Sequence, residues 1–151
     1  MVAACRLTKQ LVAVALFTAC SRADPTAPVP QLQRLTAAES AWRMARLTNY
    51  SFVGTVYCFC LDDYGSPKRV TVRSGAVTLI TDSRNDRAYP VTWRMPVDSL
   101  FALIRHQARD LPARLEVTYD ARLGYPRRIS YGQQELDGGG VILIDSLRAD
   151  Q

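Results

Sequence analysis

The chain has 151 residues, of which 48% are hydrophobic and 22% are charged, and its formal net charge is +5. This length fits a single domain, and the composition is that of a globular protein whose core needs neither a metal nor a disulfide. Two of the positive charges, Arg6 and Lys9, lie in a segment that we expect to be removed. The remaining excess is too small and too scattered for a nucleic-acid-binding protein, so no nucleic-acid partner is expected.

The first twenty residues are typical of an export signal. Arg6 and Lys9 precede a short apolar core, which is far below the roughly 20 residues needed to span a bilayer. The sequence Phe-Thr-Ala-Cys that ends at Cys20 resembles the lipobox of bacterial lipoproteins, in which a cysteine after small residues is lipidated and becomes the new N-terminus. We therefore predict a signal peptide at residues 1–20 and membrane attachment through a lipid on Cys20. The alternative is an ordinary secretory signal.

Residues 21–33 are predicted to form a disordered tether, because they contain three prolines among small and polar residues. Ser21 follows the predicted lipidation site. An Asp at this position commonly retains a Gram-negative lipoprotein at the inner membrane, so Ser21 favours the outer membrane. The predicted location is the bacterial cell envelope, with secretion as the alternative.

A first helix is predicted to begin at Thr36 and to end near Leu47. Thr36 and Glu39 have the spacing of a capping box, in which each side chain binds one free backbone N–H of the first turn. Trp42 falls on the apolar face of this helix, so we expect it to anchor the helix in the core.

Residues 50–61 form the longest apolar and β-branched run after the signal. Both alternating sets of side chains are apolar, which predicts a central strand that is covered, at least in part, on both faces. Residues 68–73 and 76–81 also alternate, and the Ser74-Gly75 pair between them predicts a hairpin.

Residues 89–94 are compatible with a short edge strand, because Pro90 is tolerated only at a sheet edge or a strand start. A second, amphipathic helix is predicted to begin at Pro96 and to end at Leu111. Its apolar stripe consists of Val97, Leu100, Phe101, Ile104 and Ala108. Three further strands are predicted at residues 114–119, 127–131 and 141–147.

This order of elements predicts one α+β domain at residues 34–149. The expected architecture is an antiparallel sheet of about five to six strands with two helices packed mainly on one face. Basic residues at strand positions, namely Lys68, Arg69, Arg127 and Arg128, are expected to be solvated, with an anionic lipid headgroup as the alternative contact.

Several short motifs lie at characteristic spacing between residues 42 and 147. The most specific are Cys58-x-Cys60 and Tyr119-Asp120 followed by Gly124-Tyr125-Pro126. With them the chain resembles a family of small bacterial secreted lipoproteins, known only as a domain of unknown function. The resemblance implies the fold and the location, and it supplies no activity.

Cys58 and Cys60 are the thiols expected to remain in the mature domain, and they are the candidate disulfide or redox site. In a regular strand they are about 6.6 Å apart along the chain, whereas a disulfide needs Cβ atoms about 3.8 Å apart. Three interpretations stay open: a structural bridge at a bent strand end, a redox-active pair whose reduction potential would distinguish it, and a soft-metal site for Cu(I).

The sequence contains no Ser-His-Asp order, HExxH, P-loop or GxGxxG motif, and His106 is expected at the surface. We predict no catalytic residue, no metal and no cofactor, and enzymatic activity stays uncertain. The favoured function is that of a lipid-anchored envelope protein that binds another envelope component. A thiol–disulfide redox protein is the alternative.

Overall fold

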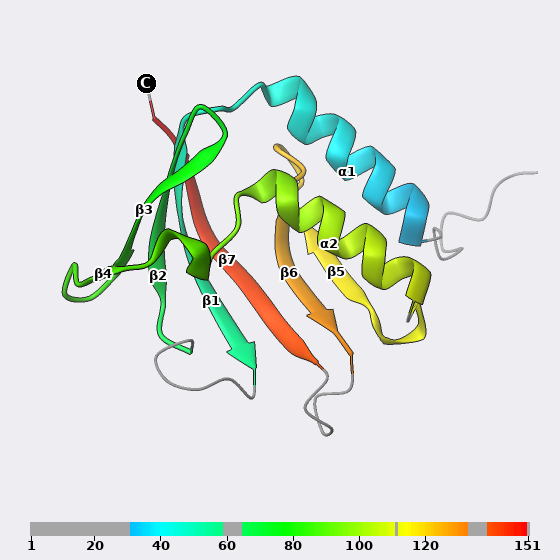
Figure 1. The fold of residues 1–151 in the computed structure, drawn as a ribbon. Coiled ribbons are helices and arrows are strands. Elements are labelled where there is room, and N and C mark those ends of the chain that lie inside the picture. The colour runs from blue at the N-terminus through cyan, green and yellow to red at the C-terminus, as the bar shows by residue number, and fades with distance from the viewer. Residues whose placement is uncertain (1–30, 59–64, 111, 133–138, 151) are drawn as a thin grey trace, which may run out of the picture.

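The computed structural model describes residues 31–58, 65–110, 112–132 and 139–150. These residues form two helices and a seven-stranded antiparallel sheet (Figure 1). The helices are α1 (Gln31–Ala45) and α2 (Val97–Asp110). The strands are β1 (Tyr50–Cys58), β2 (Lys68–Arg73), β3 (Ala76–Asp82), β4 (Ala88–Tyr89), β5 (Glu116–Tyr119), β6 (Pro126–Tyr131) and β7 (Gly140–Ala149). No helix among the described residues is long and apolar enough to cross a bilayer.

The strand order is β4-β3-β2-β1-β7-β6-β5, and every neighbouring pair is antiparallel. β1 therefore lies in the middle of the sheet, as predicted. The sheet consists of two meanders, β1 to β4 and β5 to β7, which join where β7 pairs with β1. α2 carries the chain from the β4 edge to the β5 edge (Figure 1).

The predicted count of five to six strands is wrong, because the described residues contain seven. The discrepancy arises at β4, which has two residues that pair with Ile80 and Thr81 of β3. Pro90 follows directly and has no N–H for the ladder, so the strand cannot continue. Four strands thus precede α2, and the fourth is the one that the sequence pattern gave only as a possible short edge strand at residues 89–94.

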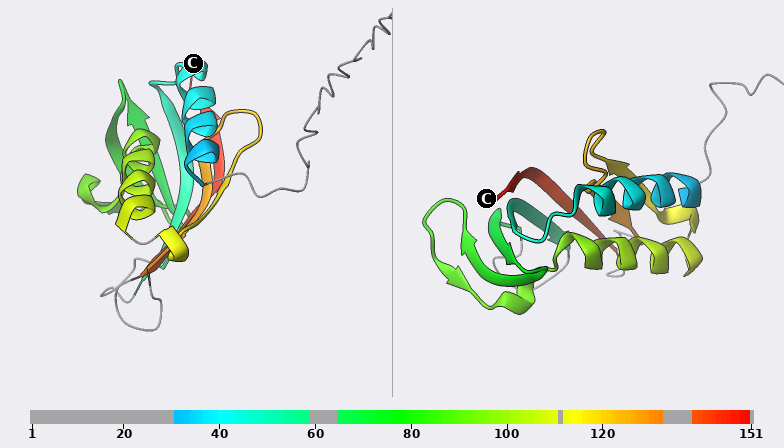
Figure 2. Two further views of the ribbon diagram at one scale, coloured as in Figure 1. Left: turned by 90° about the vertical axis from the view of Figure 1, so that its right-hand side faces the viewer. Right: turned by 90° about the horizontal axis from the view of Figure 1, so that it is seen from above.

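The two faces of the sheet differ in what covers them. Both helices lie on the same face (Figure 2), as expected. On that face β1 places Tyr50 and Phe52, which are both buried. The opposite face carries Tyr57, whose side chain is 53% exposed. Thr55 lies on the same face as Tyr57 and is only 3% exposed, so this face of β1 is covered in part.

The hairpin between β2 and β3 has the predicted turn. Arg73 pairs with Ala76, and both turn residues have positive φ, 50° at Ser74 and 78° at Gly75. Positive φ at both central positions is the type I′ geometry, whose twist matches that of the flanking strands. The turn places Val70 and Val72 of β2 in the core, as predicted.

The predicted capping box at Thr36 is wrong, because α1 begins at Gln31 and Thr36 lies within it. The Thr36 hydroxyl donates to the Leu32 carbonyl at 2.8 Å, four residues earlier in the same helix. Glu39 instead accepts hydrogen bonds from Arg43 at 2.6 Å and from Arg105 of α2 at 2.5 Å. α1 thus includes residues 31–33, at the end of the predicted tether.

Trp42 anchors α1 in the core, as predicted, and also makes a polar contact with α2. Its ring is buried and meets the Tyr50 ring edge-on, with 5.3 Å between centroids. Its Nε1–H donates to the Asp98 carboxylate at 3.2 Å, and the Val97 N–H donates to the Tyr50 hydroxyl at 3.0 Å. Burial raises the pKa of Tyr50 to about 12. These contacts connect α1, β1 and the first turn of α2.

The turn between β5 and β6 needs glycine at position 124. Gly124 has a φ of 77°, which disfavours residues with a side chain. A Cβ there would also overlap the carbonyl oxygen of Ala38 in α1. This close approach brings the β5–β6 turn against α1.

Candidate functional site

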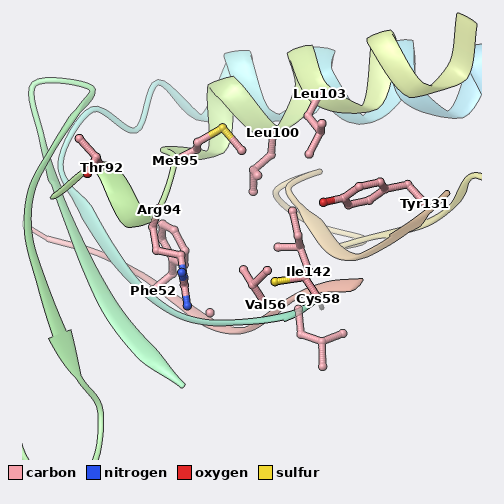
Figure 3. A pocket seen from close by; sticks show the side chains of 12 residues that line it. Phe52, Val56, Cys58, Thr92, Arg94, Met95, Leu100, Leu103, Tyr131 and Ile142 are labelled. Atoms are coloured by element: carbon pink, nitrogen blue, oxygen red, sulfur yellow. The ribbon is translucent and has the colours of Figure 1, made fainter. Parts of the chain in front are cut away.

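A largely apolar cavity lies between α2 and the face of the sheet that the helices cover (Figure 3). Its volume is about 330 Å³. The sheet contributes Val56 of β1 and Ile142 of β7, which are partners in the β1–β7 ladder. Leu100 and Leu103 of α2 line the opposite side. The cavity is therefore bounded by three elements whose backbones are fixed by ladder or helix hydrogen bonds.

The floor of this cavity includes a glycine at position 54. Gly54 lies between Phe52 and Val56 on the covered face of β1. A Cβ there would be 3.2 Å from the Phe52 ring and 3.3 Å from the Leu143 carbonyl oxygen. The register of β1 against β7 also shifts at this point, between Val53 and Gly54. The extra residue is Asp145 of β7, so the bulge bends β7 at this point and redirects its side chains.

Few polar side chains line the cavity, and they come from its two ends. Thr92 and Arg94 belong to the segment between β4 and α2, and Tyr131 ends β6. Arg94 is 8% exposed. Among the described residues that line the cavity, it is the one with a charged side chain. Figure 3 shows the Tyr131 hydroxyl pointing into the space between α2 and the sheet. Burial raises the pKa of Tyr131, so its hydroxyl stays protonated at neutral pH and can donate a hydrogen bond.

Cys58 is the last residue of β1 and also lines the cavity. Cys60 and Cys20 lie outside the described residues, so the predicted pairing of Cys58 with Cys60 stays a prediction, as does the lipid on Cys20. No group of three or more His, Cys, Asp or Glu side chains in the described part of the chain could hold a metal ion.

A second cluster of polar side chains surrounds Lys68, which is fully buried. Its ammonium group lies 3.3 Å from the Asp82 carboxylate, 4.1 Å from the Tyr89 ring centroid, and within hydrogen-bond distance of the Ser66 hydroxyl. The expectation that Lys68 is solvated is therefore wrong. Its charge is stabilised by a carboxylate, a hydroxyl and the face of an aromatic ring.

Asp82 is also held by Arg84, whose side chain donates two hydrogen bonds at 3.1 Å. The Arg84 backbone N–H adds a third at 2.9 Å. These hydrogen bonds keep the pKa of Asp82 well below its usual range. The cluster fixes the β2–β3 ladder to the loop that follows it, and we interpret it as structural.

The other residues considered from the sequence lie apart from the cavity. His106 is 62% exposed on α2 and lies 2.8 Å from Asp110. Asp120 shapes its turn by accepting hydrogen bonds from the backbone N–H groups of Arg122 and Leu123. Arg94 and Tyr131 were not identified as site residues, because an edge-strand pattern and a strand end gave no sign that they face one cavity.

A family model described as "Family of unknown function (DUF6174)" matches residues 34–146, so the chain belongs to that family. This confirms the resemblance at the level of a domain of unknown function. No curated protein and no solved structure shows a significant match to the chain.

Proposed function

We propose that this member of the DUF6174 family is a lipid-anchored bacterial cell-envelope protein that binds a small apolar molecule and has no catalytic role. The observation that supports binding is the cavity between α2 and the sheet. Binding sites for small molecules are mostly apolar hollows of about 300–1,000 Å³ with a small number of polar groups. The cavity has this character, and its size is at the lower end of the range.

The proposal predicts that filling the cavity abolishes binding. Val56→Phe adds a ring on the covered face of β1, where Figure 3 shows the Val56 side chain directed into the cavity. With 1-octanol as a neutral apolar probe, calorimetric titration of the full-length protein should give a dissociation constant at least about tenfold weaker for this variant than for the wild type.

Val53→Phe is the matched control, because it makes the same change in the same strand on the opposite face. Val53 pairs with Arg69 and Ser146 on the open side of the sheet. The Val53→Phe variant should bind 1-octanol as tightly as the wild type does. Thermal melting should show that both variants are folded. Equal binding by wild type and Val56→Phe would contradict the assignment of the cavity as the site.

The proposed location rests on the charged start, the short apolar core and the Ala19-Cys20 junction of the sequence. Cys20→Ala is expected to move the protein from the membrane fraction to the soluble envelope fraction, because it removes the thiol to which the lipid would be attached through a thioether. Ser21→Ala is the matched control and should stay with the membrane. Identical fractionation of Cys20→Ala and wild type would refute the lipid anchor.

A further inference from the structure

We infer that the cavity takes an apolar monocarboxylic acid, with the carboxylate bound by Arg94. The inference rests on the proposed binding function and adds the chemical class of the ligand. It depends on which side chains line the cavity and on how they are placed (Figure 3).

The first step concerns charge. Arg94 supplies a positive charge to the described lining, which contains no Asp, Glu, Lys or His. Only 8% of Arg94 is exposed. A charge that is largely removed from water interacts strongly with an opposite charge, and disfavours a like one. The cavity therefore favours an anionic group and disfavours an amine.

The second step concerns geometry. A guanidinium group has five N–H donors in a planar fork that matches the two oxygens of a carboxylate. Arg94 also has an interaction within the protein, and five donors allow it to keep that contact while it binds a ligand. Its backbone is extended, with φ −140° and ψ 156°, and Figure 3 shows the side chain directed toward the sheet.

The third step concerns the body of the ligand. Val56, Leu100 and Ile142 line the space between Arg94 and Tyr131, and all three are aliphatic. A chain of methylene groups would bury apolar surface against them. The volume of about 330 Å³ suits one short chain better than a two-chain membrane lipid.

The test compares three ligands of equal length on the full-length wild-type protein: octanoate, 1-octanol and octylamine, each titrated calorimetrically at pH 7. Octanoate should bind at least about tenfold more tightly than 1-octanol, and octylamine should bind most weakly. Arg94→Met should remove the preference for octanoate, so that octanoate and 1-octanol bind this variant with similar dissociation constants. Arg94→Lys should keep part of the preference, because it keeps the charge and loses the fork.

The outcomes separate this inference from the proposed function. If 1-octanol binds the wild type as tightly as octanoate, the carboxylate inference is overturned and the cavity remains a binding site. If neither ligand binds, both proposals fail. The comparison of ligands on the wild type decides the matter even where Arg94→Met does not fold. A preference that survives intact in folded Arg94→Met would also overturn the role of Arg94.

Discussion

Phe101→Ala is expected to lower the free energy of unfolding by about 3–5 kcal/mol, the loss typical of a buried phenylalanine reduced to alanine. Phe101 is 1% exposed and belongs to the core cluster that joins α2 to both α1 and the sheet. Removal of the ring would leave a void between α2 and the sheet. The void cannot close, because hydrogen bonds fix the backbone of the helix on one side and of the strands on the other. Chemical denaturation of the wild type and the variant measures the difference.

Arg109→Ala is the control for this measurement, because Arg109 lies on the exposed side of the same helix. It should change the free energy of unfolding by no more than about 0.5 kcal/mol. A loss below about 1 kcal/mol for Phe101→Ala would show that α2 does not pack through this residue. That result would also undermine the cavity, since Leu100 and Leu103 are placed by the same helix face.

Asp82→Asn is expected to lower the thermal midpoint by about 10 °C or more, because it leaves the buried Lys68 ammonium without its carboxylate. Asparagine keeps a side-chain oxygen that can accept the hydrogen bond from the Arg84 N–H. The change therefore removes mainly the charge. Adding Lys68→Met to Asp82→Asn should recover much of the loss, since the double variant buries no unpaired charge. A double variant that is less stable than Asp82→Asn would contradict this interpretation.

The same carboxylate makes the stability of the protein depend on pH. The pKa of Asp82 is lowered in the folded state by its hydrogen bonds with Arg84, so the unfolded chain binds a proton at higher pH than the folded one. Its contribution is therefore present above about pH 4, the ordinary pKa of an Asp. It is lost progressively as the pH falls below that value toward the folded pKa. Asp82→Asn should lack this part of the acid sensitivity.

Local patterns predicted those elements whose residues specify their own conformation. Ser74-Gly75 supplied the turn geometry that joins two alternating strands, and the hairpin formed as expected. The stripe through Phe101 and Ile104 identified both the second helix and its buried face. The capping box failed because Leu35 extends the apolar stripe of α1 toward its N-terminus, and its burial outweighs a local cap at Thr36.

The sequence pattern could not predict which strands become neighbours in the sheet. β7 inserts between β1 and β6, so the two ends of the domain meet in the middle of the sheet. No local signal specifies which strands become neighbours, since each strand has two edges that can pair. The cavity depends on this arrangement, because Val56 and Ile142 become adjacent only when β1 pairs with β7.

The buried lysine carried a signal that could have been used. Lys68 has the same alternation parity as Val70 and Val72, which were correctly placed in the core. That parity puts its side chain on the covered face, where a charge needs a partner. Its pairing with Asp82 was not predictable in the same way, because the register set by the Ser74-Gly75 turn would place Lys68 opposite Thr81. A register shift between Thr71 and Val72 displaces the ladder by one residue and brings Asp82 opposite Lys68. Arg94 had no comparable signal, because it ends a segment, residues 89–94, that the sequence pattern predicted only as a possible short edge strand.

The most direct test of the binding function is to identify the small molecule that co-purifies with the protein from its native cells. The full-length wild type, Val56→Phe and Val53→Phe would be purified in parallel, extracted with organic solvent, and analysed by mass spectrometry. Binding in the cavity predicts that one small apolar molecule accompanies wild type and Val53→Phe in equimolar amount, and that Val56→Phe lacks it. The carboxylate inference predicts further that this molecule is an acid. Identical extracts from all three proteins would contradict the proposed function.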